Sequence, residues 1–375
     1  MIKRSIYQRV KPRIFKGKAI IVIGPRQSGK TTFINQLLLD YPGQYYRFNG
    51  DEPDVREQFK NATSTRLKSL IRDKKIVFID EAQRIEEIGL AIKLLVDNYP
   101  DIQVIATGSS AFDLAGKIKE PLTGRKYEYR LFPLSYQEMV NDHGLLEEKR
   151  YLQHRLIFGY YPEIVTKQAE EIELLTLLAD SYLFKDLFNL EKIKKPLLLE
   201  KIIRVLAFQV GNEVSYNEIA QLVGADNQTV EKYISLMEKA YIIHRLPALS
   251  RNKRNEIKKG QKIFFWDNGI LNTIKGNLND LSSRSDVGAL WENFVISERR
   301  KYLSNNFIND RSYFWRNTEK MEIDYIEERN NLYSAFEIKW NPLKKVRFSK
   351  SFTGNHDVYE TKVINPDTFP DWISM

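Results

Sequence analysis

The chain has 375 residues and a formal net charge of +9, with 58 lysines and arginines against 49 aspartates and glutamates. It contains no cysteine and four histidines, which excludes disulfides, zinc–thiolate sites and iron–sulfur clusters and leaves little for a histidine-based metal site. The basic excess fits a polyanionic partner, but charge on this scale also serves solubility alone. No signal-peptide core and no run of about 18 apolar residues occurs, so we expect a cytoplasmic chain without a membrane segment.

Short apolar runs alternate with helical stretches over the first third of the chain. The run KAIIVIG ends in glycine and is followed by a stretch with apolar residues at helical spacing, which predicts a strand and then a helix over 30–41. The predicted strands are 18–24, 44–49, 74–80, 102–108 and 126–131. Apolar strands separated by helices favour an α/β fold with a parallel sheet that is buried on both faces.

The stretch GPRQSGKTT follows the first predicted strand and fits the pattern G-x-x-x-x-G-K-[ST]. Backbone N–H groups must close around phosphate oxygens, and glycine permits such a tight loop. Lys30 would reach the β and γ phosphates of ATP, and the Thr31 hydroxyl would ligate Mg²⁺. The alternative is a glycine-rich turn, which the strand before and the helix after disfavour. The predicted nucleotide-binding residues are Gly24, Pro25, Arg26, Gln27, Ser28, Gly29, Lys30, Thr31 and Thr32.

Two adjacent acids end the apolar run IVFID and begin the next stretch. In an open α/β sheet the ligand lies at the carboxyl ends of the strands, so Asp80 is placed to hold Mg²⁺ and Glu81 to orient or deprotonate water. The pair favours hydrolysis over transfer to a small-molecule acceptor, although acids also begin ordinary helices. After the strand 102–108, Ser109 is the candidate contact to the γ-phosphate or to water, and a simple helix cap is the alternative.

Arg125 lies immediately before the predicted strand 126–131. An arginine there could reach a transition-state phosphate, either its own or that of a neighbouring copy. The alternative is an ordinary solvated surface charge.

The stretches GPRQSGKTT, VFIDEAQRI, IATGSSAF and LTGRKYEYRLFPLSYQE occur in this order. Together they resemble the AAA-type P-loop ATPases of bacteria and archaea that carry a C-terminal domain similar to PD-(D/E)xK nucleases. The resemblance covers nearly the whole chain and implies an ATP-binding domain at 1–140. It implies the roles given above for the phosphate-loop residues and acids, a sensor role for Ser109 and a catalytic role for Arg125. It does not supply a physiological substrate.

The middle of the chain predicts a helical connector at 141–195 and then a winged helix-turn-helix module at 196–275. A capping box is expected from Ser215 and Glu218. The predicted elements are helices at 197–210 and 215–224, a link at 225–228, a further helix from 229, and strands at 240–249 and 261–267.

Seven lysines and arginines and one acid lie between residues 245 and 262. We expect DNA contacts from the helix around Asn227, Gln228 and Lys232, and phosphate contacts from the basic hairpin at 251–262. The alternative is a rigid arm that packs on protein and carries a solvated hairpin.

The last segment, 280–375, holds a third set of residues. Asp324 is expected to end a strand, and Glu337 and Lys339 lie two residues apart on one face of the next strand. Two carboxylates and a lysine suit metal-dependent phosphodiester cleavage, and the resemblance to a nuclease-like α/β domain adds Glu292 as the acid on a helix. The alternative is alternating charge on a half-exposed strand.

Two functions are therefore open. The first is a Mg²⁺-dependent ATP hydrolase that moves a DNA-binding or DNA-cleaving C-terminal half. The second is a slow ATP-dependent switch with an inactive nuclease-like domain and a protein partner. A homo-oligomer is compatible with either function.

Overall fold

The computed structural model describes residues 1–108, 122–179, 195–250 and 260–374. The chain forms two compact units, one of residues 1–134 with 239–241 and one of residues 135–238 with 242–375. In the described part of the chain, no helix combines the length and the apolar character that a bilayer crossing requires.

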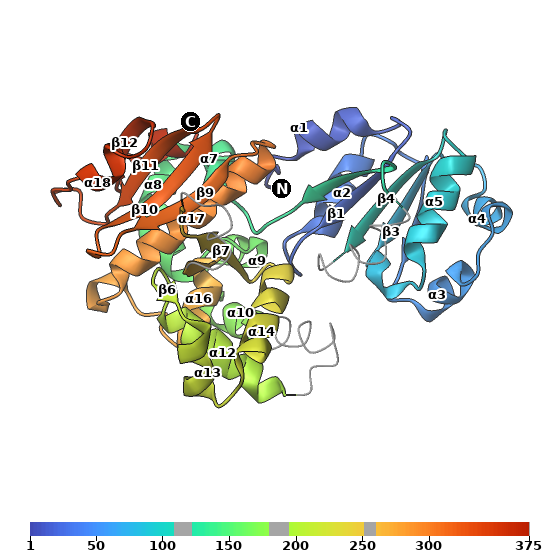
Figure 1. The fold of residues 1–375 in the computed structure, drawn as a ribbon. Coiled ribbons are helices and arrows are strands. Elements are labelled where there is room, and N and C mark those ends of the chain that lie inside the picture. The colour runs from blue at the N-terminus through green and yellow to red at the C-terminus, as the bar shows by residue number, and fades with distance from the viewer. Residues whose placement is uncertain (109–121, 180–194, 251–259, 375) are drawn as a thin grey trace. The chain divides into compact units, whose positions relative to one another are not determined.

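Unit 1 is built on a five-stranded parallel sheet with the order β2-β3-β4-β1-β5 (Figure 1). The strands β1, β3 and β4 are buried along their whole length, whereas β2 and β5 at the edges are partly exposed. The five predicted strands and the parallel sheet are thereby confirmed. Their bounds are β1 (Ala19–Ile23), β2 (Tyr45–Asn49), β3 (Ile76–Asp80), β4 (Gln103–Gly108) and β5 (Lys126–Arg130).

Helices α1 (Tyr7–Val10) and α2 (Lys30–Leu38) bury apolar side chains against one face of this sheet. The helix α2 ends before the predicted Tyr41, because Tyr41 precedes a proline and such a residue is pushed out of the helical region. The remaining elements of unit 1 are η1 (Lys11–Arg13), α3 (Pro53–Phe59), α4 (Ser64–Ile71), η2 (Ala82–Arg84) and α5 (Ile88–Asn98).

Unit 2 contains a three-stranded antiparallel sheet with the order β6-β8-β7 and helices before and between its strands. The predicted helices and the strands β7 and β8 are present, but the short strand β6 between α12 and α13 was not expected, and the winged-helix assignment stays a prediction. The link before α14 is shorter than predicted, because Asp226 caps the helix by accepting from the Thr229 N–H at 2.8 Å. Their bounds are α12 (Pro196–Phe208), β6 (Glu213–Val214), α13 (Tyr216–Val223), α14 (Asn227–Lys239), β7 (Ile243–Pro247) and β8 (Gln261–Phe265).

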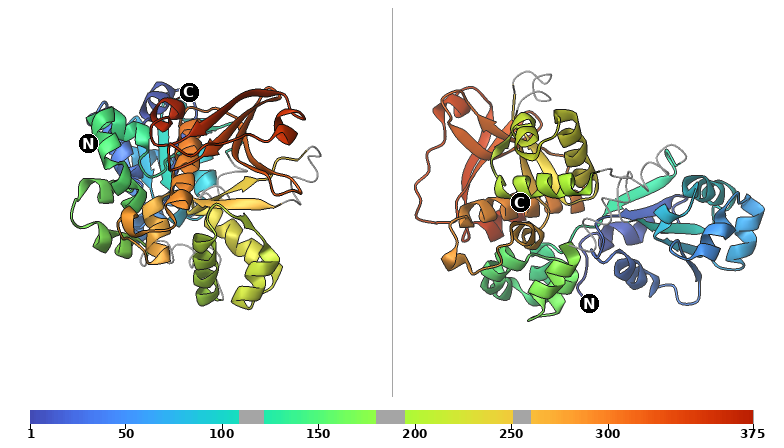
Figure 2. Two further views of the ribbon diagram at one scale, coloured as in Figure 1. Left: turned by 90° about the vertical axis from the view of Figure 1, so that its left-hand side faces the viewer. Right: turned by 90° about the horizontal axis from the view of Figure 1, so that it is seen from below.

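Among the described residues of unit 2, the other strands form a four-stranded sheet with the order β12-β11-β10-β9. The strands β9, β10 and β11 are antiparallel neighbours, and β12 runs parallel to β11. Figure 2 shows the long helix α17, in orange, running along this sheet, in red. The bounds are α17 (Val287–Asn305), β9 (Arg311–Arg316), β10 (Glu322–Arg329), β11 (Leu332–Ile338), α18 (Lys350–Thr353), β12 (Val358–Ile364) and α19 (Phe369–Ile373).

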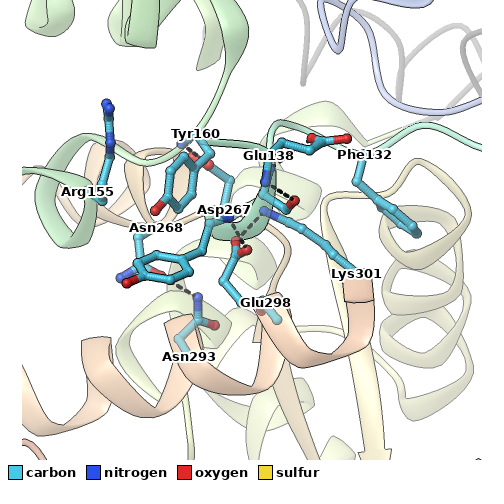
Figure 3. A network of polar contacts seen from close by, with 12 residues as sticks. Phe132, Glu138, Arg155, Tyr160, Asp267, Asn268, Asn293, Glu298 and Lys301 are labelled. Carbon is cyan, nitrogen blue, oxygen red and sulfur yellow. Dashed lines mark hydrogen bonds and ion pairs between the residues drawn. The ribbon is translucent and has the colours of Figure 1, made fainter. Parts of the chain in front are cut away.

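A buried polar network connects α17 to the strand β8 and to the helices on either side (Figure 3). The Glu298 carboxylate accepts from the Tyr136 N–H at 2.7 Å and from Lys301 Nζ at 2.7 Å. Asn293 pairs with the backbone of Phe265 and with Asn268. These contacts join residues of three predicted domains, 1–140, 196–275 and 280–375, in one buried network. The other helices here are α7 (Tyr136–His143), α8 (Leu145–Phe158), α9 (Pro162–Thr166), α10 (Glu171–Leu178), α16 (Asn268–Lys275) and η4 (Leu281–Ser283).

Candidate nucleotide site and carboxylate–lysine cluster

The phosphate loop joins the end of β1 to the start of α2. A Cβ atom at Gly24 would lie 2.0 Å from the Leu131 carbonyl oxygen, so only glycine fits there without a backbone shift. Gly29 has a φ of +86° immediately before Lys30, the first residue of α2. Gly24 is thus required because a larger residue would clash, and Gly29 because its backbone is left-handed.

Lys30 folds back over the loop. Its ammonium group donates to the carbonyl oxygens of Gly24 at 3.0 Å and Pro25 at 2.7 Å. The Ser28 hydroxyl donates to the Pro25 carbonyl at 2.8 Å, and the Arg4 guanidinium donates to the Ser28 carbonyl at 2.7 Å. The Lys30 amine therefore lies inside the loop, where the motif requires a cation for phosphate. Arg4, which the sequence reasoning missed, supports the loop from the N-terminal segment.

Asp80 is the central polar residue of the site. Its carboxylate accepts from the Thr31 hydroxyl at 3.0 and 3.1 Å and from the Thr107 hydroxyl at 2.5 Å. Arg47 on β2 donates to the same carboxylate at 2.8 Å. The structure thus brings together the predicted metal ligands Thr31 and Asp80. Arg47 was missed, although a polar side chain on a neighbouring strand of the same sheet is a signal that could have found it.

Glu81 follows the end of β3 with a φ of +48°, which is uncommon for a residue other than glycine. Its N–H donates to the Thr107 hydroxyl at 3.3 Å, and its carboxylate accepts from Gln83 Nε2 at 2.6 Å. Sparsely populated backbone geometry at a polar edge is typical of functional sites. The predicted Ser109 lies outside the described residues.

Arg125 lies at the amino end of the sheet. Its carbonyl accepts from the N–H of Ala19, the first residue of β1, and its side chain pairs with Asp97 at 2.6 Å. The strand β1 carries the chain about 16 Å from there to the phosphate loop, at about 3.3 Å per residue. Arg125 is therefore not near the phosphate loop of its own chain, and its catalytic role stays a prediction.

A second polar site lies within unit 2 and is called here the carboxylate–lysine cluster; its members are Lys262, Glu292, Glu322, Asp324, Glu337 and Lys339. The Lys262 ammonium lies 3.0 Å from Glu292 and 2.6 Å from Glu322. The Lys339 ammonium lies 2.6 Å from Asp324 and 2.8 Å from Glu337. The four predicted residues thus belong to one cluster, to which the structure adds Lys262 and Glu322.

Two sequence expectations about this cluster differ from the structure. Asp324 does not end a strand but is the third residue of β10, directly beside β11. Lys262 does not belong to an exposed basic hairpin, since it is 1% exposed. Its charge is satisfied by acids that are distant in sequence, which a count of local charges does not reveal. Residues 251–259 of the predicted hairpin lie outside the described residues.

Burial and crowding shape the ionisation of this cluster. Burial raises the pKa of Glu292 to about 7, and burial together with the nearby charge of Asp324 raises the pKa of Glu337 to about 7. Burial alone would lower the pKa of Lys262, but Glu292, Glu322 and Asp324 outweigh it and raise that pKa above its usual value. Lys262 therefore stays protonated.

The exposed face of α14 carries the residues that the sequence proposes as DNA contacts. Asn227, Gln228 and Lys232 are all exposed. Arg245, on β7, forms an ion pair with Glu238 at 3.3 Å and donates a hydrogen bond to the Ser235 hydroxyl at 2.6 Å.

Comparisons with known proteins divide the chain into three segments. Residues 16–140 match a family model described as an AAA domain. Residues 149–281 and 287–368 match two models described as domains of unknown function, DUF8612 and DUF4143.

Among curated proteins, an uncharacterized protein of Mycobacterium tuberculosis is 24% identical over 347 residues, which is 90% of this chain and 74% of that protein. An uncharacterized protein of Haemophilus influenzae is 25% identical over 276 residues, 67% of each chain. Among solved structures, a Walker-type ATPase of Pyrococcus abyssi superposes with a TM-score of 0.50 at 14% identity, covering 73% of this chain and 96% of that one, which shows a likeness of fold. The match over residues 16–140 and the geometry of the phosphate loop make unit 1 a P-loop domain of the AAA type.

Proposed function

We propose that this chain hydrolyses ATP with Mg²⁺ and that the cycle controls the action of unit 2 on DNA. The observation that carries the ATPase proposal is the pairing of a lysine inside a phosphate loop with a hydroxyl–carboxylate pair beside it. The Lys30 amine is held only 2.7 to 3.0 Å from loop carbonyls, and Thr31 is bonded to Asp80. A cation and a hard oxygen donor set so arranged fit a Mg²⁺–triphosphate.

Each residue of the nucleotide site has a separate proposed role. The backbone of 24–29 would cradle the β and γ phosphates, and Lys30 would neutralise them. Thr31 and Asp80 would hold Mg²⁺, which supplies charge stabilisation to the phosphate oxygens. Glu81 would orient or deprotonate water, and its carboxylate is kept in place by Gln83.

The test compares two substitutions in the site with two exposed controls. Lys30→Ala should lose most nucleotide affinity, because the phosphate charge loses its cation. Glu81→Gln should bind ATP but lose about 10²- to 10⁴-fold in turnover, the usual contribution of a general base. Isothermal titration with a slowly hydrolysed ATP analogue and phosphate release measure the two effects. Lys16→Ala and Glu86→Gln, both at exposed positions, serve as matched controls.

The outcome for Glu81 decides the assignment of the base. Full turnover by Glu81→Gln would remove Glu81 from the mechanism. Normal ATP binding by Lys30→Ala would remove the phosphate loop as the nucleotide site.

Action on DNA rests on unit 2. Its support is the exposure of Asn227, Gln228 and Lys232 on α14, together with the basic residues that follow β7 in sequence. Exposed polar side chains on a helix can contact base edges, and lysines and arginines can contact phosphates. Under this proposal Glu292, Asp324, Glu337 and Lys339 form a nuclease-like site.

A second function is favoured by one specific observation. Both lysines of the carboxylate–lysine cluster are already ion-paired with its acids. This arrangement supports a slow ATP-dependent switch that presents an inactive nuclease-like fold to a protein partner. Mass measurement in Mg²⁺ with an ATP analogue, with and without duplex DNA, separates the two functions and reports any homo-oligomer.

A further inference from the structure

We infer that Lys262 and Lys339 take the place of a divalent cation in the carboxylate–lysine cluster, with Lys262 as the fixed member, so that this cluster is a lysine-bridged structural site. The inference concerns unit 2 alone and does not depend on ATP hydrolysis. It deepens the second function proposed above.

The first support is geometric. Lys262 reaches two carboxylates from different elements, Glu292 on α17 at 3.0 Å and Glu322 at the start of β10 at 2.6 Å. Lys339 reaches the other two acids, and the Asp324 carboxylate also accepts from the Ile338 N–H at 2.8 Å. Every acid of the cluster is thus bonded to a lysine. In the described part of the chain, no group of three or more acidic, histidine or cysteine side chains is arranged to hold a metal ion.

The fold also prevents the Lys262 side chain from moving out of the cluster. It lies on β8, the central strand of its sheet, and is paired in register with Glu213 of β6 and Leu246 of β7. Its ammonium lies 5.5 Å from the centre of the Phe314 ring, and the residue is 1% exposed. Removing the ammonium from this position would leave two half-buried carboxylates, those of Glu292 and Glu322, without a counter-charge, which is unfavourable.

The third support is electrostatic. A divalent ion would have to bind the same carboxylate oxygens that the ammonium groups contact. Two cations so close together repel strongly in a buried site.

The nucleotide site provides a contrast within the same chain. There a basic residue, Arg47, also pairs with a carboxylate, Asp80, at 2.8 Å. The Arg47 side chain is 42% exposed, whereas the Lys262 side chain is 2% exposed. The Arg47 guanidinium borders on water and can move into it, although the Asp80 side chain itself is only 8% exposed. Arg47 can therefore yield to Mg²⁺ at Asp80, while Lys262 cannot yield to a metal.

The experiment measures Mn²⁺ binding to the full chain by electron paramagnetic resonance, without nucleotide. An Asp80→Asn background removes the carboxylate of the nucleotide site, so that binding reports on unit 2. We expect no stoichiometric Mn²⁺ binding up to roughly millimolar concentration, the weak end of carboxylate sites. Lys262→Met, which keeps an apolar stem against Phe314, should bind one Mn²⁺ per chain, and Lys262→Arg should not. Adding Glu292→Gln to Lys262→Met should remove the gained binding.

Two outcomes would overturn the inference. One is stoichiometric Mn²⁺ binding by the Asp80→Asn protein that Glu292→Gln or Glu337→Gln abolishes, and this result needs no substitution of Lys262. The other is a folded Lys262→Met protein that binds no Mn²⁺, because Lys262 would then not be occupying the place of a metal ion. If circular dichroism shows that Lys262→Met is unfolded, Lys262→Gln takes its place in the comparison. Failure of ATP hydrolysis in the Lys30 and Glu81 assays would leave all these outcomes unchanged.

Discussion

Replacing Asn293 by alanine tests the buried network that connects α17 to the strand β8. Asn293 is 0% exposed; its side-chain oxygen accepts from the Phe265 N–H at 2.7 Å, and its amide donates to the Phe265 carbonyl at 3.0 Å and to Asn268 Oδ1 at 2.8 Å. The strand β6 pairs with β8 only at Gln261 and Lys262. At Phe265 the Asn293 side chain therefore makes the backbone hydrogen bonds that a neighbouring strand would otherwise make.

The magnitude follows from what Asn293→Ala leaves unpaired. The Phe265 carbonyl keeps a donor, because the Ser297 hydroxyl donates to it at 2.7 Å. The Phe265 N–H loses its acceptor and Asn268 Oδ1 loses its donor, and each buried polar group left unpaired costs about 1–3 kcal/mol. Alanine recovers about 0.6 kcal/mol through its higher helix propensity. The net loss is about 3 kcal/mol, which lowers the unfolding temperature of a unit of this size by about 6–12 °C.

Calorimetry of the full chain measures the temperature change, and hydrogen exchange of the peptide containing Phe265 measures the local opening. Asn279→Ala, at an exposed position, is the matched control and should change stability by less than about 0.5 kcal/mol. Asn293→Asp should lower the free energy of unfolding at least as much as Asn293→Ala, because it turns a carboxylate oxygen toward the Phe265 carbonyl and Asn268 Oδ1. Equal unfolding temperatures for Asn293→Ala and Asn279→Ala would refute the assignment of a structural role to this amide.

Two further predictions concern the unassigned basic residues. Arg125→Ala should still bind ATP but lose turnover. Because Arg125 lies far from its own phosphate loop, it would act on a neighbouring copy, and mixing Arg125→Ala with Lys30→Ala should restore activity. Mixtures without any rescue would exclude that role. Replacing Lys253, Arg254, Lys258 and Lys259 by serine should weaken DNA binding about equally for all sequences and flatten its dependence on salt, as lost phosphate contacts do. An unchanged salt slope in fluorescence anisotropy would assign these residues elsewhere.

The sheet of unit 1 and its phosphate site could be predicted because both depend on short, local patterns. The strand β1 is an unbroken apolar run, and Gly24 to Thr31 follow it at fixed spacing. Asp80 ends β3, so its place beside Thr31 follows from the carboxyl edge that parallel strands share. These inferences required no knowledge of long-range contacts.

The missed residues depend on partners that are distant in sequence. The place of Arg47 on a predicted strand of the same sheet is a partial signal, but only the register of β2 against β3 shows that its guanidinium meets Asp80. Lys262 was counted with the basic hairpin because it adjoins that segment, whereas the fold buries it against Glu292 and Glu322. The location of Arg125 at the opposite edge of the sheet likewise required the register of β5 against β1.

The buried network of unit 2 has a consequence for how this chain can be divided and exchanged. The segments 149–281 and 287–368 match separate family models, yet Asn293 and Glu298 in the second segment find their partners at Phe265 and Asn268 in the first and at Tyr136 before both. A fragment that begins near residue 280 would lack the hydrogen-bond partners of the Asn293 amide, and the Glu298 carboxylate would keep Lys301 but lose the Tyr136 N–H. The two segments should therefore be inherited, transplanted and truncated together, along with the chain from residue 135 that belongs to the same unit.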